Sequence, residues 1–255
     1  MSGSFRNFID NIPPVTKNLI IINLIIWLAT FLFPQQIGSF IMTHLGLHYV
    51  EGSLFNPAQI ITYMFVHDPH NFFHILFNMF TLWMFGRVLE QVWGSRRFFI
   101  FYMICGIGAG LIQEGVWALI WKHEYVAGIA QINGLTFDHA RQVVDAAVAA
   151  GDQNWISAID AFMNSMVVVG ASGAIFGLLL GFAFVFPNMP LYLFFIPVPI
   201  KAKYMVIGYG LIEFVLGVGG AQSPIAHFAH VGGMLFGLIL LLYWKKKGTL
   251  GGGIY

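Results

Sequence analysis

The sequence predicts an all-α, polytopic membrane protein built as a bundle of six transmembrane helices. Of its 255 residues, 58% are hydrophobic and only 9% are charged, whereas soluble domains carry about 25% charged residues. Six apolar segments come near the roughly 20 residues that a helix needs to cross a bilayer. Membrane lipid is therefore an expected partner of this chain. Its formal net charge of +1 argues against nucleic acid as a partner, because nucleic-acid binding favours a strongly basic face.

The six predicted spans follow one another along almost the whole chain. They cover residues 19–33, 72–89, 98–121, 167–187, 204–219 and 225–244. This pattern divides the chain into an N-terminal arm at 1–18, a six-helix membrane domain at 19–244 and a tail at 245–255. Tandem repeats and a second domain are not evident in the sequence.

The basic residues predict the orientation of the bundle. All but Lys122 and Arg141 of the 12 Lys and Arg residues lie on the side of the two termini. Loops rich in Lys and Arg stay in the cytoplasm. We therefore expect both termini in the cytoplasm and an integral, multi-pass protein of a bacterial plasma (inner) membrane.

Two segments on the external side are too long to be simple turns. Residues 34–71 are broadly apolar but contain glycine and proline, and we expect short helices there at the membrane interface. Residues 122–166 form a polar external insertion between the third and fourth spans. Within it, the stretch from Thr136 to Ala150 is typical of a helix, with Thr136 or Asp138 as its cap and Gly151 as its stop.

Unusual polar residues lie near the external start of the second, fourth and sixth spans. His74 and Asn78 share one face of the second span, because they are four residues apart. Ser172 lies in the fourth span and His230 in the sixth. At about 1.5 Å per residue, both lie roughly 8 Å below the predicted start of their helices. Three helices therefore present polar groups at one depth.

Small residues explain how the fourth and sixth spans could approach each other. Glycines recur every four residues on both spans, at Gly173, Gly177 and Gly181 and at Gly233 and Gly237. Such stripes allow the backbones of transmembrane helices to pack closely. If the stripes face each other, a hydrogen bond between Ser172 and His230 becomes possible.

A serine beside a histidine predicts nucleophilic catalysis. The histidine takes the hydroxyl proton during attack and then returns it to the leaving amine. Candidate donors for the oxyanion are the side chains of His74 and Asn78 and the backbone N–H of Ser172. Asp and Glu are absent from the fourth span and from the sixth near His230. We therefore expect a Ser–His dyad without an acid partner, and neither a cofactor nor a metal ion.

Each of these residues also has a structural interpretation. A Gly-x-Ser-Gly in an apolar helix is usually a packing motif, and a histidine at a helix mouth is often only interfacial. His74 and Asn78 could form a hydrogen-bonding pair between helices. Glu90 is expected to bind backbone amides or Arg87, and the roles of Glu114 and Glu213 stay open. The catalytic interpretation is favoured because these residues are predicted at the same depth and on the same side of the membrane.

Four motifs, in order, resemble those of the rhomboid family over nearly the whole chain. They are His74-x-x-x-Asn78, Gly86-x-x-x-Glu90-x-x-x-Gly94, Gly170-Ala-Ser172-Gly173 and Ala226-His227-Phe-Ala-His230-Val-Gly232-Gly233. The resemblance implies a rhomboid-like six-helix bundle and an intramembrane serine endopeptidase with Ser172 and His230 as its dyad. It also implies oxyanion or substrate binding by His74, Asn78 and Gly170, and packing of Phe176 against the catalytic imidazole. The implied substrates are single-pass membrane proteins, admitted between the second and fifth helices.

Two departures and two alternatives accompany the resemblance. Many rhomboids carry a Trp-Arg pair in the first external loop, whereas this chain has no Arg between Lys17 and Arg87, so the anchoring of that loop is an open question. The insertion at 122–166 is also longer than the family's usual connection. One alternative is a catalytically inactive relative that binds membrane proteins. The other is a metal transporter or intramembrane metalloprotease that uses His67, His70, His74, His227 and His230, although the sequence has no His-Glu-x-x-His motif.

Overall fold

A computed structural model describes residues 11–193, 196–219 and 226–250. Parts of three predictions lie outside these residues: most of the arm with Arg6, the predicted start of the sixth span at Ile225, and the last five residues of the tail. The described residues form a helical membrane-type bundle, in agreement with the predicted fold class. Its helices are α2 (Pro14–Leu32), α5 (Phe72–Thr81), α6 (Arg87–Trp93), α7 (Ser95–Asn133), α10 (Ser172–Val185), α11 (Ala202–Val218) and α12 (His227–Lys246), with α8 and α9 in the insertion.

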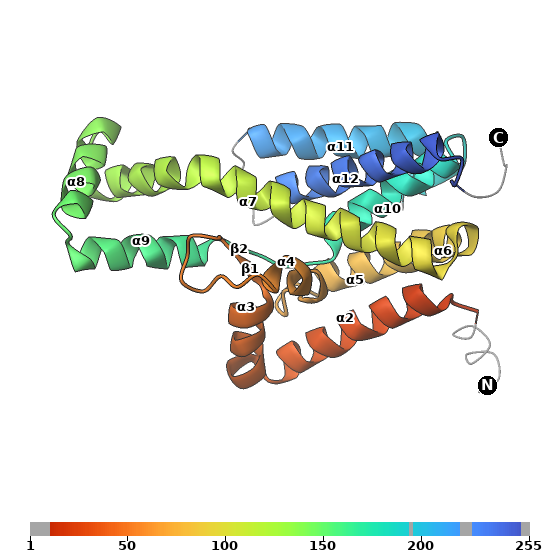
Figure 1. The fold of residues 1–255 in the computed structure, drawn as a ribbon, viewed down its shortest axis with the longest axis horizontal. Coiled ribbons are helices and arrows are strands. Elements are labelled where there is room, and N and C mark those ends of the chain that lie inside the picture. The colour runs from red at the N-terminus through yellow and green to blue at the C-terminus, as the bar shows by residue number, and fades with distance from the viewer. Residues whose placement is uncertain (1–10, 194–195, 220–225, 251–255) are drawn as a thin grey trace.

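The long helix α7 runs through the molecule, and the other helices gather around it (Figure 1). Both α10 and α12 pack against α7 and against each other, and α11 packs on α12. Helices α5 and α2 lie on the other side of α10 in this view. The core between these helices is aromatic and aliphatic, with Phe98, Phe101 and Tyr102 of α7 fully buried.

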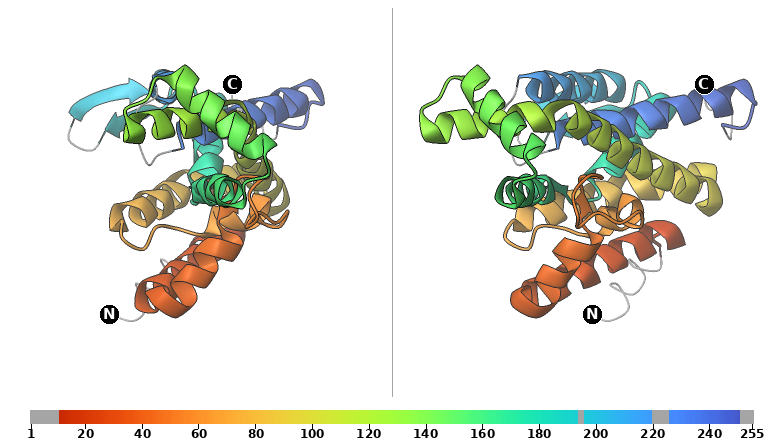
Figure 2. Two further views of the ribbon diagram at one scale, coloured as in Figure 1. Left: turned by 90° about the vertical axis from the view of Figure 1, so that its left-hand side faces the viewer. Right: turned by 60° about the vertical axis from the view of Figure 1, so that its left-hand side comes forward.

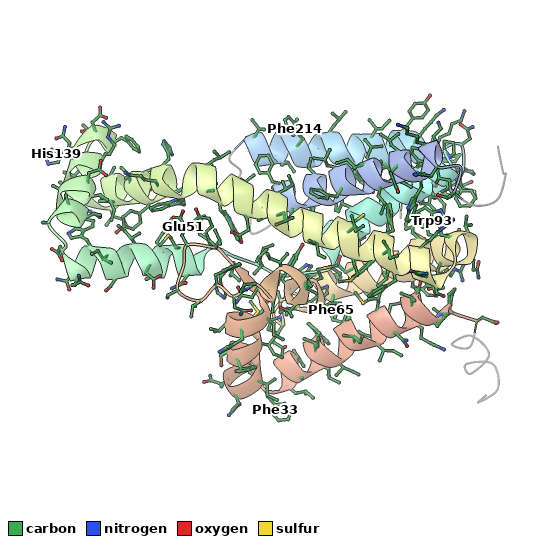
Figure 3. The ribbon with its side chains drawn as sticks, in the orientation of Figure 1. Phe33, Glu51, Phe65, Trp93, His139 and Phe214 are labelled. Carbon is green, nitrogen blue, oxygen red and sulfur yellow. The ribbon has the colours of Figure 1, made fainter. Side chains whose placement is uncertain are left out.

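The outer surface of the bundle is apolar. Phe33 after α2 and Phe214 on α11 are about half exposed, and Figure 3 shows both at the periphery. Within the part of the chain that the structure describes, four helical stretches are long and apolar enough to cross a membrane: Pro14–Leu32, Phe72–Trp93, Ser95–Asn133 and His227–Lys246. The second of these continues from α5 through a π-helical turn, η3 (Leu82–Gly86), into α6. Helices α10 and α11 are shorter, at 14 and 17 residues.

The fourth predicted span begins too early. Residues 167–171 are not helical: Val167–Val168 form strand β2, and Gly170 has a φ of +126°. Strand β2 pairs antiparallel with β1 (Leu47–His48) of the first external loop. This pairing and the left-handed backbone at Gly170 end the extended segment, so the helix starts at Ser172. Ser172 therefore lies at the mouth of α10, and the predicted depth of 8 Å within the helix is wrong.

The third predicted span ends too early. Helix α7 continues without a break past Trp121 to Asn133 and ends at Gly134, which has a φ of +63°. The additional turns are stabilised by a second small core, in which Tyr125 and Val126 pack with Ala140 and Val144 of the insertion. The insertion thus begins on an extension of α7 rather than in a loop.

The rest of the insertion is a helical hairpin at the far end of the molecule (Figure 1). Helix α8 (Phe137–Ala149) is capped by the side chain of Thr136, which accepts a hydrogen bond from the backbone N–H of His139, and Gly151 follows it with a φ of +71°. The predicted helix and both of its signals are confirmed. Helix α9 (Gln153–Ser165) was not predicted from the sequence.

The first external loop contains short helices, as the sequence predicts, and strand β1, which was not predicted. The helices are η1 (Pro34–Gly38), α3 (Ser39–Leu45), α4 (Gln59–Thr62) and η2 (Tyr63–Phe65). Helix α9 anchors this loop. Asp160 accepts hydrogen bonds from the Ser53 backbone N–H (2.9 Å) and hydroxyl (2.7 Å), and Asn164 Oδ1 accepts from Leu54 N–H at 2.9 Å. The insertion therefore provides loop contacts in a chain that lacks the Trp-Arg pair.

A buried carboxylate fastens α2 to α6. Glu90 is 2% exposed and accepts hydrogen bonds from the backbone N–H groups of Val15 and Thr16 at 2.9 and 2.7 Å. The hydroxyls of Thr16 and Ser95 also donate to it. The prediction that Glu90 binds backbone amides is confirmed.

A two-stranded hairpin joins α10 to α11 and was not predicted. Strands β3 (Pro190–Leu193) and β4 (Ile196–Lys201) pair antiparallel, and they project to one side in the left view of Figure 2. The hairpin lies at the opposite end of α10 from Ser172, so it does not contribute to the site below.

Candidate active site

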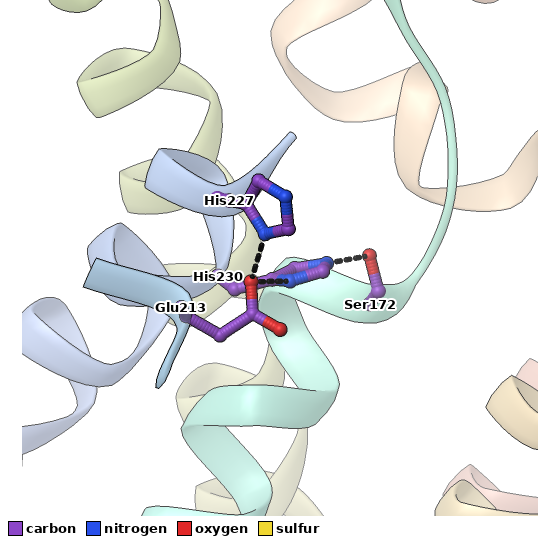
Figure 4. Close-up of polar contacts among 4 residues, drawn as sticks. All are labelled: Ser172, Glu213, His227 and His230. Atoms are coloured by element: carbon purple, nitrogen blue, oxygen red, sulfur yellow. Dashed lines mark hydrogen bonds and ion pairs between the residues drawn. The ribbon is translucent and has the colours of Figure 1, made fainter. Parts of the chain in front are cut away.

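Ser172 and His230 are hydrogen-bonded across the interface of α10 and α12. The distance from Ser172 Oγ to His230 Nε2 is 2.8 Å (Figure 4). Each side chain lies in the first turn of its helix. The sequence predicts this pair, and the structure brings the two residues together over 58 positions of sequence.

The glycine stripes make this approach possible. A Cβ atom on Gly233 would lie 1.9 Å from the carbonyl oxygen of Gly173, and one on Gly177 would lie 3.0 Å from the carbonyl oxygen of Gly233. Gly237 in turn lies opposite Gly177, because a Cβ on Gly237 would lie 3.5 Å from the Cα of Gly177. The stripes of α10 and α12 therefore face each other as predicted, and backbone contacts backbone beneath the Ser172–His230 pair.

Phe176 fixes the plane of the His230 ring. The two rings are stacked, with centroids 4.2 Å apart and an angle of 8° between their planes. Phe176 follows Ser172 by one helical turn, so α10 provides both the hydroxyl and the surface on which the imidazole rests. This contact agrees with the packing that the sequence resemblance implies.

The expectation that His230 has no acid partner is wrong. Glu213 on α11 places Oε2 at 2.9 Å from His230 Nδ1. A carboxylate only accepts hydrogen bonds, so Nδ1 carries the ring proton and Nε2 presents its lone pair to Ser172. The prediction considered only the fourth and sixth spans, whereas the acid comes from the fifth.

Glu213 also contacts a second histidine. The distance from His227 Nδ1 to the same oxygen, Oε2, is 2.7 Å. His227 and His230 are one turn apart on α12, and both are more than nine-tenths buried. One carboxylate oxygen of α11 therefore binds two imidazoles of α12 (Figure 4).

The His74 ring and the Ser172 hydroxyl both lie close to Gly170. The position of a Cβ on Gly170 would lie 2.8 Å from His74 Nε2 and 3.7 Å from Ser172 Oγ. A side chain at this position would occupy the space between the two groups, and the φ of +126° also favours glycine. Asn71 caps α5 by accepting from the backbone N–H of His74, which fixes the start of the helix that carries this imidazole.

Helices α5 and α10 carry further groups that are suited to an oxyanion. Asn78 is buried one turn after His74 on α5. The first turn of α10 begins at Ser172, so its backbone N–H groups have no carbonyl partner within the helix. Their role as oxyanion donors, like that of the His74 and Asn78 side chains, stays a prediction.

His67 also lies in this region, next to His74. The sequence analysis named it only as a ligand in the metal alternative. Its ring is fully buried and lies 5.0 Å from that of His74, measured between centroids. Both ring nitrogens are without a hydrogen-bond partner among the described residues. Burial lowers the pKa of His67 to about 3, so this imidazole stays neutral. The spacing of His67, His70 and His74 does not predict where His67 lies, because residues 66–71 are not helical.

The histidines of the metal alternative do not gather as that alternative requires. Among residues 11–193, 196–219 and 226–250, the side chains close enough to share a metal ion are Glu213, His227 and His230. His67 and His74 are adjacent to each other, and His70 is exposed.

Comparison with known protein families agrees with this arrangement. A family model described as "Rhomboid domain" matches residues 55–132 and 142–247. The chain belongs to the rhomboid family. The gap between the two matched parts, residues 133–141, covers the turn after α7 and the start of α8. The match includes every residue of the Ser172 site described above.

A rhomboid relative also matches by sequence. The chain is 26% identical over 252 residues to the protein named "Rhomboid protein 1, mitochondrial" from Saccharomyces cerevisiae. The alignment covers 93% of this chain but 58% of the relative. Membership in the rhomboid family and the apolar helices show an integral membrane protein.

Proposed function

We propose that this rhomboid is an intramembrane serine endopeptidase, with Ser172 as nucleophile and His230 as general base. The observation that carries the proposal is the 2.8 Å hydrogen bond from Ser172 Oγ to His230 Nε2, on a ring whose Nδ1 is held by Glu213. Intramembrane proteolysis is the general activity of the family to which the chain belongs. The presence of both reacting residues, already hydrogen-bonded, supports an active member rather than an inactive membrane-protein binder.

The proposed reaction has two stages. Ser172 Oγ attacks the carbonyl carbon of the scissile peptide bond while its proton passes to His230 Nε2. His230 then gives this proton to the leaving amine, the C–N bond breaks, and an ester remains on Ser172. A water molecule loses a proton to His230 and attacks the ester, and the released Ser172 recovers that proton. Glu213 accepts from Nδ1–H throughout, which stabilises the imidazolium that forms in each stage.

Negative charge on the tetrahedral intermediate needs donors that are already in place. We propose the backbone N–H groups of the first turn of α10, with the side chains of His74 and Asn78 as further donors. The helix N-terminus adds the favourable end of its dipole at the same point. Removing one such donor from a soluble protease costs about 2.7–4 kcal/mol of transition-state stabilisation.

The short length of α10 supports a site below the membrane surface. Its 14 residues cover about 21 Å at 1.5 Å per residue, whereas the hydrocarbon core is about 30 Å thick. If Val185 reaches one interface, Ser172 lies roughly 9 Å inside the other. The proposed depth therefore follows from the short helix rather than from the position of Ser172 within it.

We propose single-pass transmembrane proteins as substrates, admitted past α11. This helix contacts the bundle mainly through α12, and residues along its outer side are about 60% exposed, namely Tyr204, Leu211 and Val215. A helix with one loosely covered face can move at lower cost than one packed on all sides. Glu213 belongs to α11, so displacement of this helix would also alter the support of His230.

Cleavage in a lipid bilayer tests the proposal. Purified protein is reconstituted in liposomes with a single-pass transmembrane substrate, and product formation is compared for wild type, Ser172→Ala and His230→Ala. We expect cleavage by wild type and none above background for either variant. Unchanged cleavage by Ser172→Ala would refute the proposed nucleophile.

The alternatives predict other results in the same assay. A binding-only relative would retain substrate in wild type without releasing product. A metalloprotease would lose its activity when a chelator is added, whereas the proposed serine mechanism keeps its activity under the same treatment.

A further inference from the structure

Three metal-ligating side chains meet on the side of His230 that faces away from Ser172. Glu213 Oε2 lies 2.7 Å from His227 Nδ1 and 2.9 Å from His230 Nδ1. One ligand atom from each of the three residues lies within 4.8 Å of the other two (Figure 4). Two imidazoles come from α12 and the carboxylate from α11, so the cluster joins two helices.

The proteolytic mechanism leaves His227 without a role. Its ring is 7% exposed, and its Nε2 is buried without a hydrogen-bond partner among the described residues. A buried polar atom without a partner is destabilising. His230 alone contacts Ser172, and Glu213 needs only one imidazole to support the base. The second histidine is therefore an observation that catalysis does not explain.

The donor set selects the kind of ion. Two imidazoles and one carboxylate, with water as the fourth ligand, form a common Zn²⁺ site in proteins. Ca²⁺ and Mg²⁺ prefer six or more oxygen ligands, and this cluster offers mostly nitrogen. Ligands at about 2.0–2.1 Å from zinc are roughly 3.3 Å apart in a tetrahedral arrangement. The two separations that involve Glu213 Oε2, 2.7 and 2.9 Å, therefore need to open by about half an ångström, and all three ligand atoms already lie within 4.8 Å of one another.

We infer that Glu213, His227 and His230 form an inhibitory Zn²⁺ site of the proposed protease. Zinc binds the Nδ1 lone pairs of both imidazoles and an oxygen of Glu213. Each ring proton then moves from Nδ1 to Nε2, on His227 as well as on His230. In that tautomer the Nε2–H of His230 donates to Ser172 Oγ and has no lone pair to accept the hydroxyl proton. Zinc thereby blocks the general base without occupying the substrate site. The inhibitory effect rests on the proposed function, whereas the metal site itself does not.

Direct binding measurements test the site without relying on activity. Chelator-treated, detergent-solubilised wild type and Ser172→Ala are titrated with ZnCl₂ by isothermal calorimetry. We expect one zinc ion per chain with similar affinity in both proteins. Loss of a residue that only hydrogen-bonds to a metal ligand weakens metal binding roughly 10- to 100-fold. His227→Gln removes a ligand itself and should therefore weaken zinc binding by at least as much. His227→Cys, which restores a ligand for zinc, should bind far more tightly than His227→Gln.

A matched control uses a histidine outside the cluster. His123 lies on the exposed surface of α7, so His123→Ala should bind zinc like wild type. Zinc affinity that is unchanged in His227→Gln, or that is lost in His123→Ala, would overturn the site. Thermal unfolding of each variant without zinc separates loss of a ligand from loss of the fold, and the recovery in His227→Cys does so independently.

Activity then tests inhibition. Micromolar ZnCl₂ should suppress cleavage by wild type, EDTA should restore it, and MgCl₂ at the same concentration should have no effect. Inhibition of His227→Gln, relative to its own rate without zinc, should need at least about tenfold more zinc. Zinc bound at the cluster with full cleavage would overturn the inhibitory effect. If Ser172→Ala binds zinc but wild type cleaves nothing, the proposed function fails and the inhibitory proposal fails with it, while the metal site stands.

Discussion

His230 has two hydrogen-bonding partners at once, Ser172 on Nε2 and Glu213 on Nδ1, while its ring face rests on Phe176. Together these contacts fix the tautomer, the direction and the plane of the imidazole. A general base needs all three, because proton transfer depends on the lone pair pointing along the hydroxyl bond. The site thus contains the orienting group that a bare dyad would lack.

Replacing Glu213 by glutamine tests the importance of this orientation. Glu213→Gln keeps the size of the side chain but removes its charge and allows the wrong tautomer of His230. We expect kcat to fall by roughly 10²- to 10⁴-fold, with a much smaller change in KM, by analogy with general-base and triad losses. Steady-state cleavage measured beside thermal unfolding distinguishes this effect from a loss of stability. A kcat within a factor of two of wild type would show that Glu213 does not orient the base.

The residues that sequence analysis predicted share a local signal. Ser172, Phe176 and His230 lie in short motifs with small neighbours, and Glu90 has a glycine four residues before it and another four residues after it. Glu213 has no such signal, because the sequence does not show which face of α11 turns toward α12. His67 was grouped with His74 only in the metal alternative, on a helical spacing that residues 66–71 do not have.

At the scale of elements, the contact between α10 and α12 depends on the absence of side chains. A Cβ on Gly233 would lie 1.9 Å from a backbone carbonyl oxygen, and a helix backbone cannot move aside as a side chain can. Gly233→Ala must therefore separate the helices and the Ser172–His230 pair. We expect destabilisation of about 1–3 kcal/mol or more, seen in thermal unfolding, with a matching loss of cleavage.

Gly208 provides the control for this substitution. It lies inside α11, and a Cβ there would meet nothing within 4 Å. Gly208→Ala should be neutral or stabilising by up to about 1 kcal/mol, because alanine is the better helix former. Equal melting temperatures for the two alanine variants would contradict the close packing of α10 on α12.

The hairpin of the insertion should hold the first external loop through Asp160. Hydrogen bonds from Ser53 keep the pKa of the Asp160 carboxyl below its ordinary value. A lowered folded-state pKa means that the contact stabilises the fold above the ordinary Asp range and is lost as the pH falls through the lowered pKa. Asp160→Ala should therefore lower the hydrogen-exchange protection factors of residues 47–54 at neutral pH. Acid should lower the same protection factors in wild type, after correction for the slower intrinsic exchange in acid.

Glu124 serves as the control for Asp160, because it is an exposed acid on α7 and lies 3.9 Å from His123. Glu124→Ala should leave exchange in residues 47–54 unchanged. Since solvent screens an exposed contact, we expect the effect of Asp160→Ala to be about 1 kcal/mol. Identical exchange in the two variants would show that the hairpin does not anchor the loop.

The bounds of a helix were predicted correctly where local sequence signals alone determine them. The helix within the insertion, with its Thr136 cap and Gly151 stop, follows from local chemistry alone. The start of α10 does not, because Val167–Val168 are apolar enough to continue a span but pair with a strand 120 residues earlier. The extension of α7 likewise depends on a second core formed with α8, which a hydropathy pattern does not reveal.

At the scale of the whole molecule, the start of α2 and the end of α12 lie at one end, and α8 and α9 lie at the other (Figure 1). This arrangement agrees with two termini on the same side of a membrane. The distribution of Lys and Arg predicts that this side is the cytoplasm. The bacterial plasma membrane stays a prediction, since the relative from Saccharomyces cerevisiae is mitochondrial by name.

Cysteine labelling tests the orientation. The single native cysteine, Cys105, is fully buried and should give little background. In intact bacterial cells expressing the protein, a membrane-impermeant maleimide should label His139→Cys on α8 at once. It should label Lys246→Cys at the end of α12 only after permeabilisation. The reverse pattern would place the termini and the basic residues outside the cytoplasm.

The most direct test of the central claim is the site of covalent attack. A fluorophosphonate reacts with a serine hydroxyl only where a base activates it. We expect peptide mapping of the labelled wild-type protein to find one adduct on Ser172, abolished in Ser172→Ala and strongly reduced in His230→Ala. An adduct on another residue, or equal labelling of Ser172 in His230→Ala, would contradict the assignment of Ser172 as a nucleophile activated by His230.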